Sequence, residues 1–133
     1  HRKLENNTQE TIDHLRAAGY RIIATTPHTD DVLIEDLDLE RGPMAFFFGT
    51  ELTGLSDLVI SQADEFVKVP MYGFTESLNI SVCAALVMYS VTRRLRASDI
   101  DWHLSELRRD KVLFQWYCNA IKASDEILER FNR

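Results

Sequence analysis

The sequence predicts an α/β domain in which helices flank a parallel sheet. Short apolar runs of the kind found in buried strands alternate with stretches of helical spacing. The run Met44 to Gly49 is too apolar for a strand with one exposed face. Two of the expected strands lead into polar loops that contain glycine, and a helix follows each loop. Proteins of this class bind small molecules at the carboxyl ends of such strands.

The first αβ step lies near the start of the chain. Thr8 is a suitable N-cap for a helix that runs to about Ala18, and Gly19 is the expected C-terminal stop. Tyr20 to Thr25 then has the composition of a buried strand and ends in a polar loop. We therefore expect a helix that packs against the strand following it.

The next segment is acidic and contains scattered leucines. We expect residues 31–43 to form a surface connection or a short helical turn. Met44 to Gly49 suits the centre of a sheet that is covered on both faces. A short helix over Leu55 to Ala63 and a strand over Asp64 to Val69 complete the alternation.

The segment from Glu76 to about Arg96 is apolar on almost every side. A helix of this composition must be buried on more than one side, so we expect it to contact a second subunit. The tail from about Leu104 to Phe131 has the apolar spacing of an amphipathic helix that docks on the domain or on a partner. We place the domain boundary between residues 97 and 98.

Composition favours an ordinary globular protein. The chain has 133 residues, of which 45% are hydrophobic and 27% charged, and no apolar run is long enough to cross a membrane. Because the chain opens with polar residues, we expect no signal peptide. Cys83 and Cys118 lack the spacing of a metal site, so we expect free buried thiols, no metal and a cytoplasmic location.

The net charge of −6 is distributed unevenly. Residues 29–65 contain ten acidic residues and a single basic one, which gives −9. Residues 66–96 contain four basic residues and one acidic residue, which gives +3. We therefore expect contacts to the phosphates of a nucleic acid to come from few residues of this chain, or from chain that is absent here.

Two loop motifs carry the functional information. The first is G-x-E-x-x-G, formed by Gly49, Glu51 and Gly54, and the second is V-P-M-x-G followed by S-L-N-I-S-V over residues 69–82. The glycines allow a ligand to approach the main chain, and the peptide groups of Val69, Met71 and Leu78 are placed to read the edge of an adenine. The alternative is that these residues serve only as turn glycines and core residues.

Together the two motifs resemble motifs two and three of the SpoU (TrmH-type) family of RNA ribose 2′-O-methyltransferases. The resemblance covers roughly residues 10 to 97. It implies an α/β trefoil-knot fold and S-adenosylmethionine as cofactor. It places the cofactor contacts at Thr25 (or Thr26, one residue on), Gly49, Val69, Met71 and Leu78.

The resemblance also implies three catalytic residues, which are Glu51, Ser77 and Asn79. Each has a structural alternative, since Glu51 and Ser77 could serve a helix N-terminus and Asn79 could be a buried amide one turn into the helix. The family's first motif, N-x-x-x-R, supplies an arginine that helps to activate the ribose hydroxyl. That motif is not found here, so we expect this chain to be the C-terminal part of a longer enzyme whose first strands are missing.

Three functions remain open from the sequence. The leading hypothesis is a homodimeric methyltransferase that acts on a ribose 2′-hydroxyl of tRNA or rRNA, with a tRNA guanosine slightly favoured. The second is a non-catalytic module of the same fold that dimerises or docks RNA. The third, a generic nucleotide-binding domain, lacks both of the usual glycine-rich phosphate motifs.

Overall fold

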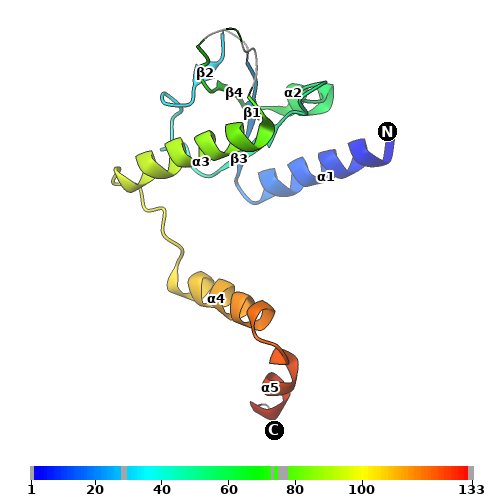
Figure 1. The fold of residues 1–133 in the computed structure, drawn as a ribbon, viewed down its shortest axis with the longest axis vertical. Coiled ribbons are helices and arrows are strands. Elements are labelled where there is room, and N and C mark those ends of the chain that lie inside the picture. The colour runs from blue at the N-terminus through cyan, green and yellow to red at the C-terminus, as the bar shows by residue number, and fades with distance from the viewer. Residues whose placement is uncertain (1, 28–29, 73, 75–77, 132–133) are drawn as a thin grey trace. The chain divides into compact units, whose positions relative to one another are not determined.

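A computed structural model describes residues 2–27, 30–72, 74 and 78–131. The chain divides into two compact units, His1–Ile100 and Asp101–Arg133. The described elements, labelled in Figure 1, are α1 (Arg2–Ala17), β1 (Arg21–Thr25), β2 (Val32–Leu33), β3 (Met44–Phe48), α2 (Asp57–Gln62), β4 (Glu65–Lys68), α3 (Ile80–Arg96), α4 (Glu106–Ala120) and α5 (Ser124–Phe131).

The described strands form one parallel sheet with the order β2-β4-β1-β3. In its register Thr25 lies opposite Phe48 on one side and Val67 on the other, so β1, β3 and β4 end at the same edge of the sheet. The expected α/β class with parallel pairing is confirmed. The expectation that Met44 to Gly49 lies at the centre of the sheet is wrong, because β3 is an edge strand among the described residues.

Apolar side chains cover both faces of the sheet. Ile23 and Val67 belong to a core cluster on one face, where Val87 and Val91 of α3 pack against them. Ile22 belongs to a second cluster on the other face, with Ile12 of α1 and Val59 of α2. The residues of β3 alternate between these two clusters, which is why this edge strand is apolar on both sides.

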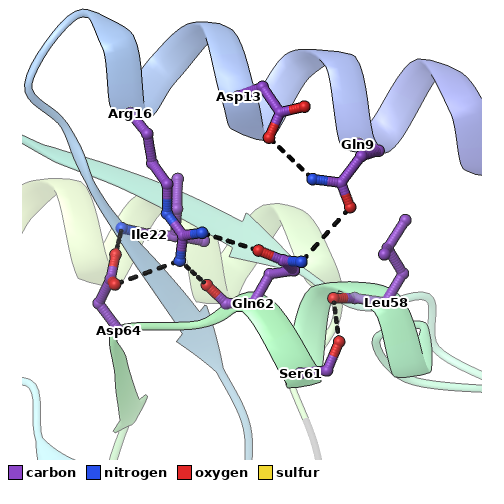
Figure 2. A network of polar contacts seen from close by, with 8 residues as sticks. All are labelled: Gln9, Asp13, Arg16, Ile22, Leu58, Ser61, Gln62 and Asp64. Atoms are coloured by element: carbon purple, nitrogen blue, oxygen red, sulfur yellow. Dashed lines mark hydrogen bonds and ion pairs between the residues drawn. The ribbon is translucent and has the colours of Figure 1, made fainter.

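Helices α1 and α2 are tied together by the polar contacts in Figure 2. Arg16 donates from Nη1 to Gln62 Oε1 (2.7 Å) and from Nη2 to the Gln62 carbonyl (2.5 Å) and Asp64 Oδ1 (3.3 Å). Asp64 in turn accepts the backbone N–H of Ile22 through Oδ2 at 2.6 Å. The network therefore joins α1, the end of α2 and the start of the sheet.

The segment over residues 31–43 is part of the core, which corrects the expected surface connection. Ile34, Leu37 and Leu39 are buried in the cluster beneath α3. Arg94 of α3 donates to the carbonyls of Ile34 (2.9 Å) and Leu37 (2.5 Å). Most acidic side chains of the segment are exposed, whereas Ile34, Leu37 and Leu39 are buried. The segment is therefore amphipathic, which its high charge did not indicate.

Two helix boundaries differ from the expected ones. Thr8 lies inside α1, which begins at Arg2, so Thr8 is not the N-cap of that helix. α3 begins at Ile80, and its N-cap is Asn79, whose Oδ1 accepts the backbone N–H of Ser81 at 2.9 Å. Asn79 is therefore exposed at the helix end and is not a buried amide one turn into the helix.

The second unit consists of α4 and α5 instead of one continuous helix. The break falls at Ala123, which has a positive φ of 61°. Such a backbone conformation does not continue a right-handed helix. Ser124 begins α5, and its hydroxyl donates to the Cys118 carbonyl of α4 at 2.8 Å.

The structure also bears on the membrane and thiol expectations. None of the helices that it describes is long and apolar enough to cross a membrane. Cys83 and Cys118 are both free and only partly buried, so the expected free thiols are present with less burial than the sequence indicated.

Candidate active site

A pocket of about 260 Å³ opens at the carboxyl edge of the sheet. Its walls come from the residues that end or follow β1, β3 and β4 and from the start of α3. Parallel strands that end together create such a crevice because their connections diverge there. The lining residues are Thr25, Thr26, Pro27, Phe48, Gly49, Thr50, Glu51, Gly54, Val67, Val69, Met71, Leu78, Ile80 and Cys83.

The loop after β3 is a tight hairpin that closes on Gly49. Thr50 and Gly54 exchange two backbone hydrogen bonds of 3.0 Å, and Gly54 has a φ of +67°. A Cβ on Gly49 would lie 2.4 Å from the Gly54 carbonyl carbon. Only glycine lets this hairpin fold back against the pocket wall.

Glu51 and Asn79 connect the two motif loops. The Asn79 side-chain amide donates to Glu51 Oε1 at 2.6 Å. The Oδ1 atom of Asn79 accepts from the N–H of Ser81 at 2.9 Å and from its hydroxyl at 2.5 Å. The first motif is thereby attached to the N-terminus of α3, and both side chains remain exposed to solvent.

The first strand supplies the two threonines between which the sequence left the cofactor contact open. Both Thr25 and Thr26 line the pocket. The Thr25 hydroxyl donates to the Phe47 carbonyl at 2.9 Å, and the Thr26 hydroxyl bonds to the Asp31 carboxylate. These bonds fix the end of β1 against β3 and against the segment that follows.

The structure places most of the expected site residues together. All five expected cofactor residues and Glu51 line the pocket. Asn79 lies beside it through its bond to Glu51. Ser77, the third expected catalytic residue, lies outside the described residues. Their roles in binding or catalysis are treated below as proposals.

Sequence reasoning missed two pocket residues on α3. Ile80 and Cys83 line the pocket, and Val87, one helical turn further, is buried in the core. The spacing 80, 83, 87 marks one face of a helix and would have identified them once the helix start was known. Burial raises the pKa of the Cys83 thiol above its usual range.

The family model described as the SpoU rRNA Methylase family matches residues 2–89. The chain belongs to the SpoU methylase family. Among curated relatives, this SpoU family chain is 47% identical over 116 residues to a tRNA (guanosine(18)-2′-O)-methyltransferase of Borreliella burgdorferi, with 87% of this chain and 53% of the relative covered. The chain thus spans about half the length of the relative that it matches.

Solved structures give the same family. The crystal structure of the Aquifex aeolicus TrmH/SpoU tRNA modifying enzyme matches with a TM-score of 0.70 and 29% identity, covering 85% of this SpoU family chain and 58% of the other. The SpoU methyltransferase AviRb of Streptomyces viridochromogenes, in complex with the cofactor AdoMet, matches with a TM-score of 0.59 and 26% identity over 70% and 37% of the two chains.

Proposed function

We propose that the protein containing this chain is an S-adenosylmethionine-dependent RNA methyltransferase that acts on a ribose 2′-hydroxyl. The observation that supports this most strongly is the pocket, in which the residues of both family motifs meet at one edge of the sheet. The curated relative with 47% identity carries this activity in its name.

The pocket fits the adenosyl part of the cofactor. Its side-chain walls are largely apolar, with Val69, Met71 and Leu78 among them, and suit a flat base. Gly49 and Gly54 both line the pocket and approach each other closely. Because neither has a Cβ, the main chain of the hairpin forms this part of the wall. We assign cofactor binding to Thr25, Gly49, Val69, Met71 and Leu78, with the two motif loops as the frame.

When bound, the cofactor supplies an electrophilic sulfonium methyl group. The chain's own contribution is to hold the acceptor ribose in line with that group and to give its proton a polar environment. Glu51 and Asn79 form a hydrogen-bonded pair at the pocket mouth, and we assign them this orienting role together with Ser77. The expected arginine of the family's first motif has no match in this sequence.

We propose tRNA as the substrate, with a guanosine as the methylated nucleotide. This rests on the Borreliella burgdorferi relative named for guanosine 18 of tRNA and on the Aquifex aeolicus structure of a tRNA modifying enzyme. The remaining expectations also stay proposals, namely the trefoil knot, a boundary near residues 97 and 98, and a cytoplasmic location.

We further propose a homodimer formed through α3. Val82, Leu86 and Tyr89 are exposed large apolar residues on α3, and their spacing places them along one side of the helix. Val87 and Val91 occupy the side that faces the core. The outward apolar side is the surface that a second subunit would cover.

The decisive experiment measures transfer of a radiolabelled methyl group from S-adenosylmethionine to tRNA by the full-length protein. Nuclease digestion of the product should release a 2′-O-methylated nucleoside. Leu78→Arg, which fills the pocket with a charged side chain, should abolish transfer and the binding of S-adenosylhomocysteine. Cofactor binding without transfer to any RNA would instead support the non-catalytic module.

A further inference from the structure

The rim of the pocket carries the most exposed large apolar side chains among the described residues of the first unit. Leu52 is 97% exposed, Tyr72 93% and Phe74 completely. The other exposed large apolar residues described in that unit range from 41% to 66%. The three residues lie on the two loops that carry the family motifs.

The chain connects each of these residues closely to the pocket wall. Tyr72 directly follows Met71, and Leu52 directly follows Glu51, and both of these neighbours line the pocket. Consecutive Cα atoms are about 3.8 Å apart, so the backbone of each rim residue is adjacent to the wall. Phe74 lies three residues after Met71 and four before Leu78, between two wall residues of the same loop.

From these observations we propose that Tyr72 and Phe74 form a stacking platform for the unstacked base of the nucleotide to be methylated. The inference rests on the proposed function. A ribose that presents its 2′-hydroxyl to the pocket keeps its base close to the pocket wall, and Tyr72 and Phe74 belong to a loop that contributes Met71 and Leu78 to this wall. Aromatic side chains are the usual partners of bases that have left their stack in RNA.

Charge favours a base over the phosphate backbone at this rim. Glu51 is exposed and is the one charged side chain among the described residues that line the pocket. Phosphates are repelled by such a surface, whereas the uncharged face of a base is not. The contact is therefore assigned to the base, and the backbone must be held elsewhere.

The test compares the full-length protein with Tyr72→Ala, Phe74→Ala and the double variant. Binding of a tRNA transcript is measured by filter retention, and methyl transfer by steady-state kinetics. In the double variant, RNA binding should be about ten-fold weaker or more, and KM for tRNA should rise by a similar factor. Base stacking on an aromatic ring has effects of this size. Tyr72→Phe and Phe74→Trp should retain binding, because both keep a ring.

Four controls assign the effect to the base. Affinity for S-adenosylhomocysteine and the sedimentation coefficient should not change in the double variant. Phe131→Ala removes an aromatic ring that is 87% exposed in the second unit and should leave KM unchanged. A fluorescent base analogue at the methylated position of the tRNA should be quenched on binding by the wild type and not by the double variant.

Several results would overturn the proposal. RNA binding within two-fold of the wild type would show that the rings do not contact RNA. A weakened dimer would assign them to a subunit contact, and loss of S-adenosylhomocysteine binding would assign them to the cofactor. Failure of the proposed function is separate, because it would appear as a wild type that transfers no methyl group to RNA.

Discussion

Gly49 is the residue at which the pocket depends most directly on the absence of a side chain. We expect Gly49→Ala to weaken S-adenosylhomocysteine binding by at least ten-fold, because its Cβ would lie 2.4 to 2.7 Å from backbone atoms of Gly54 and Leu55. Backbone atoms cannot move aside as a side-chain tip does, so the hairpin must shift. Calorimetric titration measures the loss.

Gly42→Ala is the matched control for this substitution. Gly42 has a φ of +97° and open space around its Cβ position, and it does not line the pocket. The substitution should cost about 1 kcal/mol of stability through backbone strain and leave cofactor affinity unchanged. Equal loss of binding in both variants would show that the close approach at Gly49 is unimportant.

Cys83 gives a pH-dependent reporter of the pocket. Because burial raises its thiol pKa, the folded chain holds the proton to a higher pH than the unfolded chain. The resulting stabilisation is complete below the unfolded pKa of about 8.5 and is lost as the pH rises toward the folded pKa. We therefore expect the free energy of unfolding of the Cys118→Ser variant to fall above this pH. In the double variant that also carries Cys83→Ala, the free energy of unfolding should fall less over the same pH range.

The same thiol reports ligand binding. In the Cys118→Ser background, alkylation of Cys83 at pH 8 should be slow in the folded protein, fast in urea and slower still with S-adenosylhomocysteine, since Cys83 lines the pocket. Protection is followed by mass spectrometry. Labelling that does not respond to the ligand would place the cofactor away from Cys83.

Asp64 and Arg16 belong to one polar network but should contribute differently to the free energy of unfolding. Asp64→Ala removes the acceptor of the Ile22 N–H, and because Ile22 is fully buried we expect a loss of about 1–3 kcal/mol in urea denaturation. Arg16→Ala removes two exposed hydrogen bonds to Gln62 and an ion pair whose side chains are 40% and 36% exposed, so its loss should be at most about 1 kcal/mol. The reverse order would mean that α1 is held mainly by its arginine.

At the scale of elements, the N-terminus of α3 is where helix capping and the site meet. Asn79→Ala should lower stability by about 1 kcal/mol and weaken S-adenosylhomocysteine binding, because it removes both the cap and the bond to Glu51. Asn79→Asp should keep the cap and stability, since aspartate caps equally well. It should still weaken binding, because two carboxylates then face each other.

A double variant separates the two roles. In Glu51→Gln with Asn79→Asp, the new glutamine amide can donate to the new carboxylate and restore the connection between the loops. We expect S-adenosylhomocysteine affinity to recover relative to Asn79→Asp alone, with a coupling of about 0.5–3 kcal/mol. Additive losses would show that the hydrogen bond between residues 51 and 79 does not shape the pocket.

The same elements show what the sequence could and could not predict. The parallel sheet and the pocket followed from short apolar runs and glycine loops, because these depend on local composition. The helix start at Ile80 was missed, since an apolar segment has no periodicity to mark its end and only the Asn79 cap defines it. The buried segment over residues 31–43 was missed because its carbonyls are held by a distant residue, Arg94.

At the scale of the whole molecule, the outward side of α3 decides whether the proposed dimer forms. Leu86→Glu should convert the full-length dimer to a monomer at micromolar concentration in sedimentation velocity. Leu86 is 41% exposed, so a glutamate at this position is tolerated in a monomer. In the interface the same glutamate would be an unpaired buried charge, which should raise the Kd of the dimer by about 100-fold or more. Ile60→Glu makes the same change at a residue of α2 that is 42% exposed and should leave the dimer intact. A Leu86→Glu protein that remains dimeric would place the interface elsewhere and leave the apolar side of α3 unexplained.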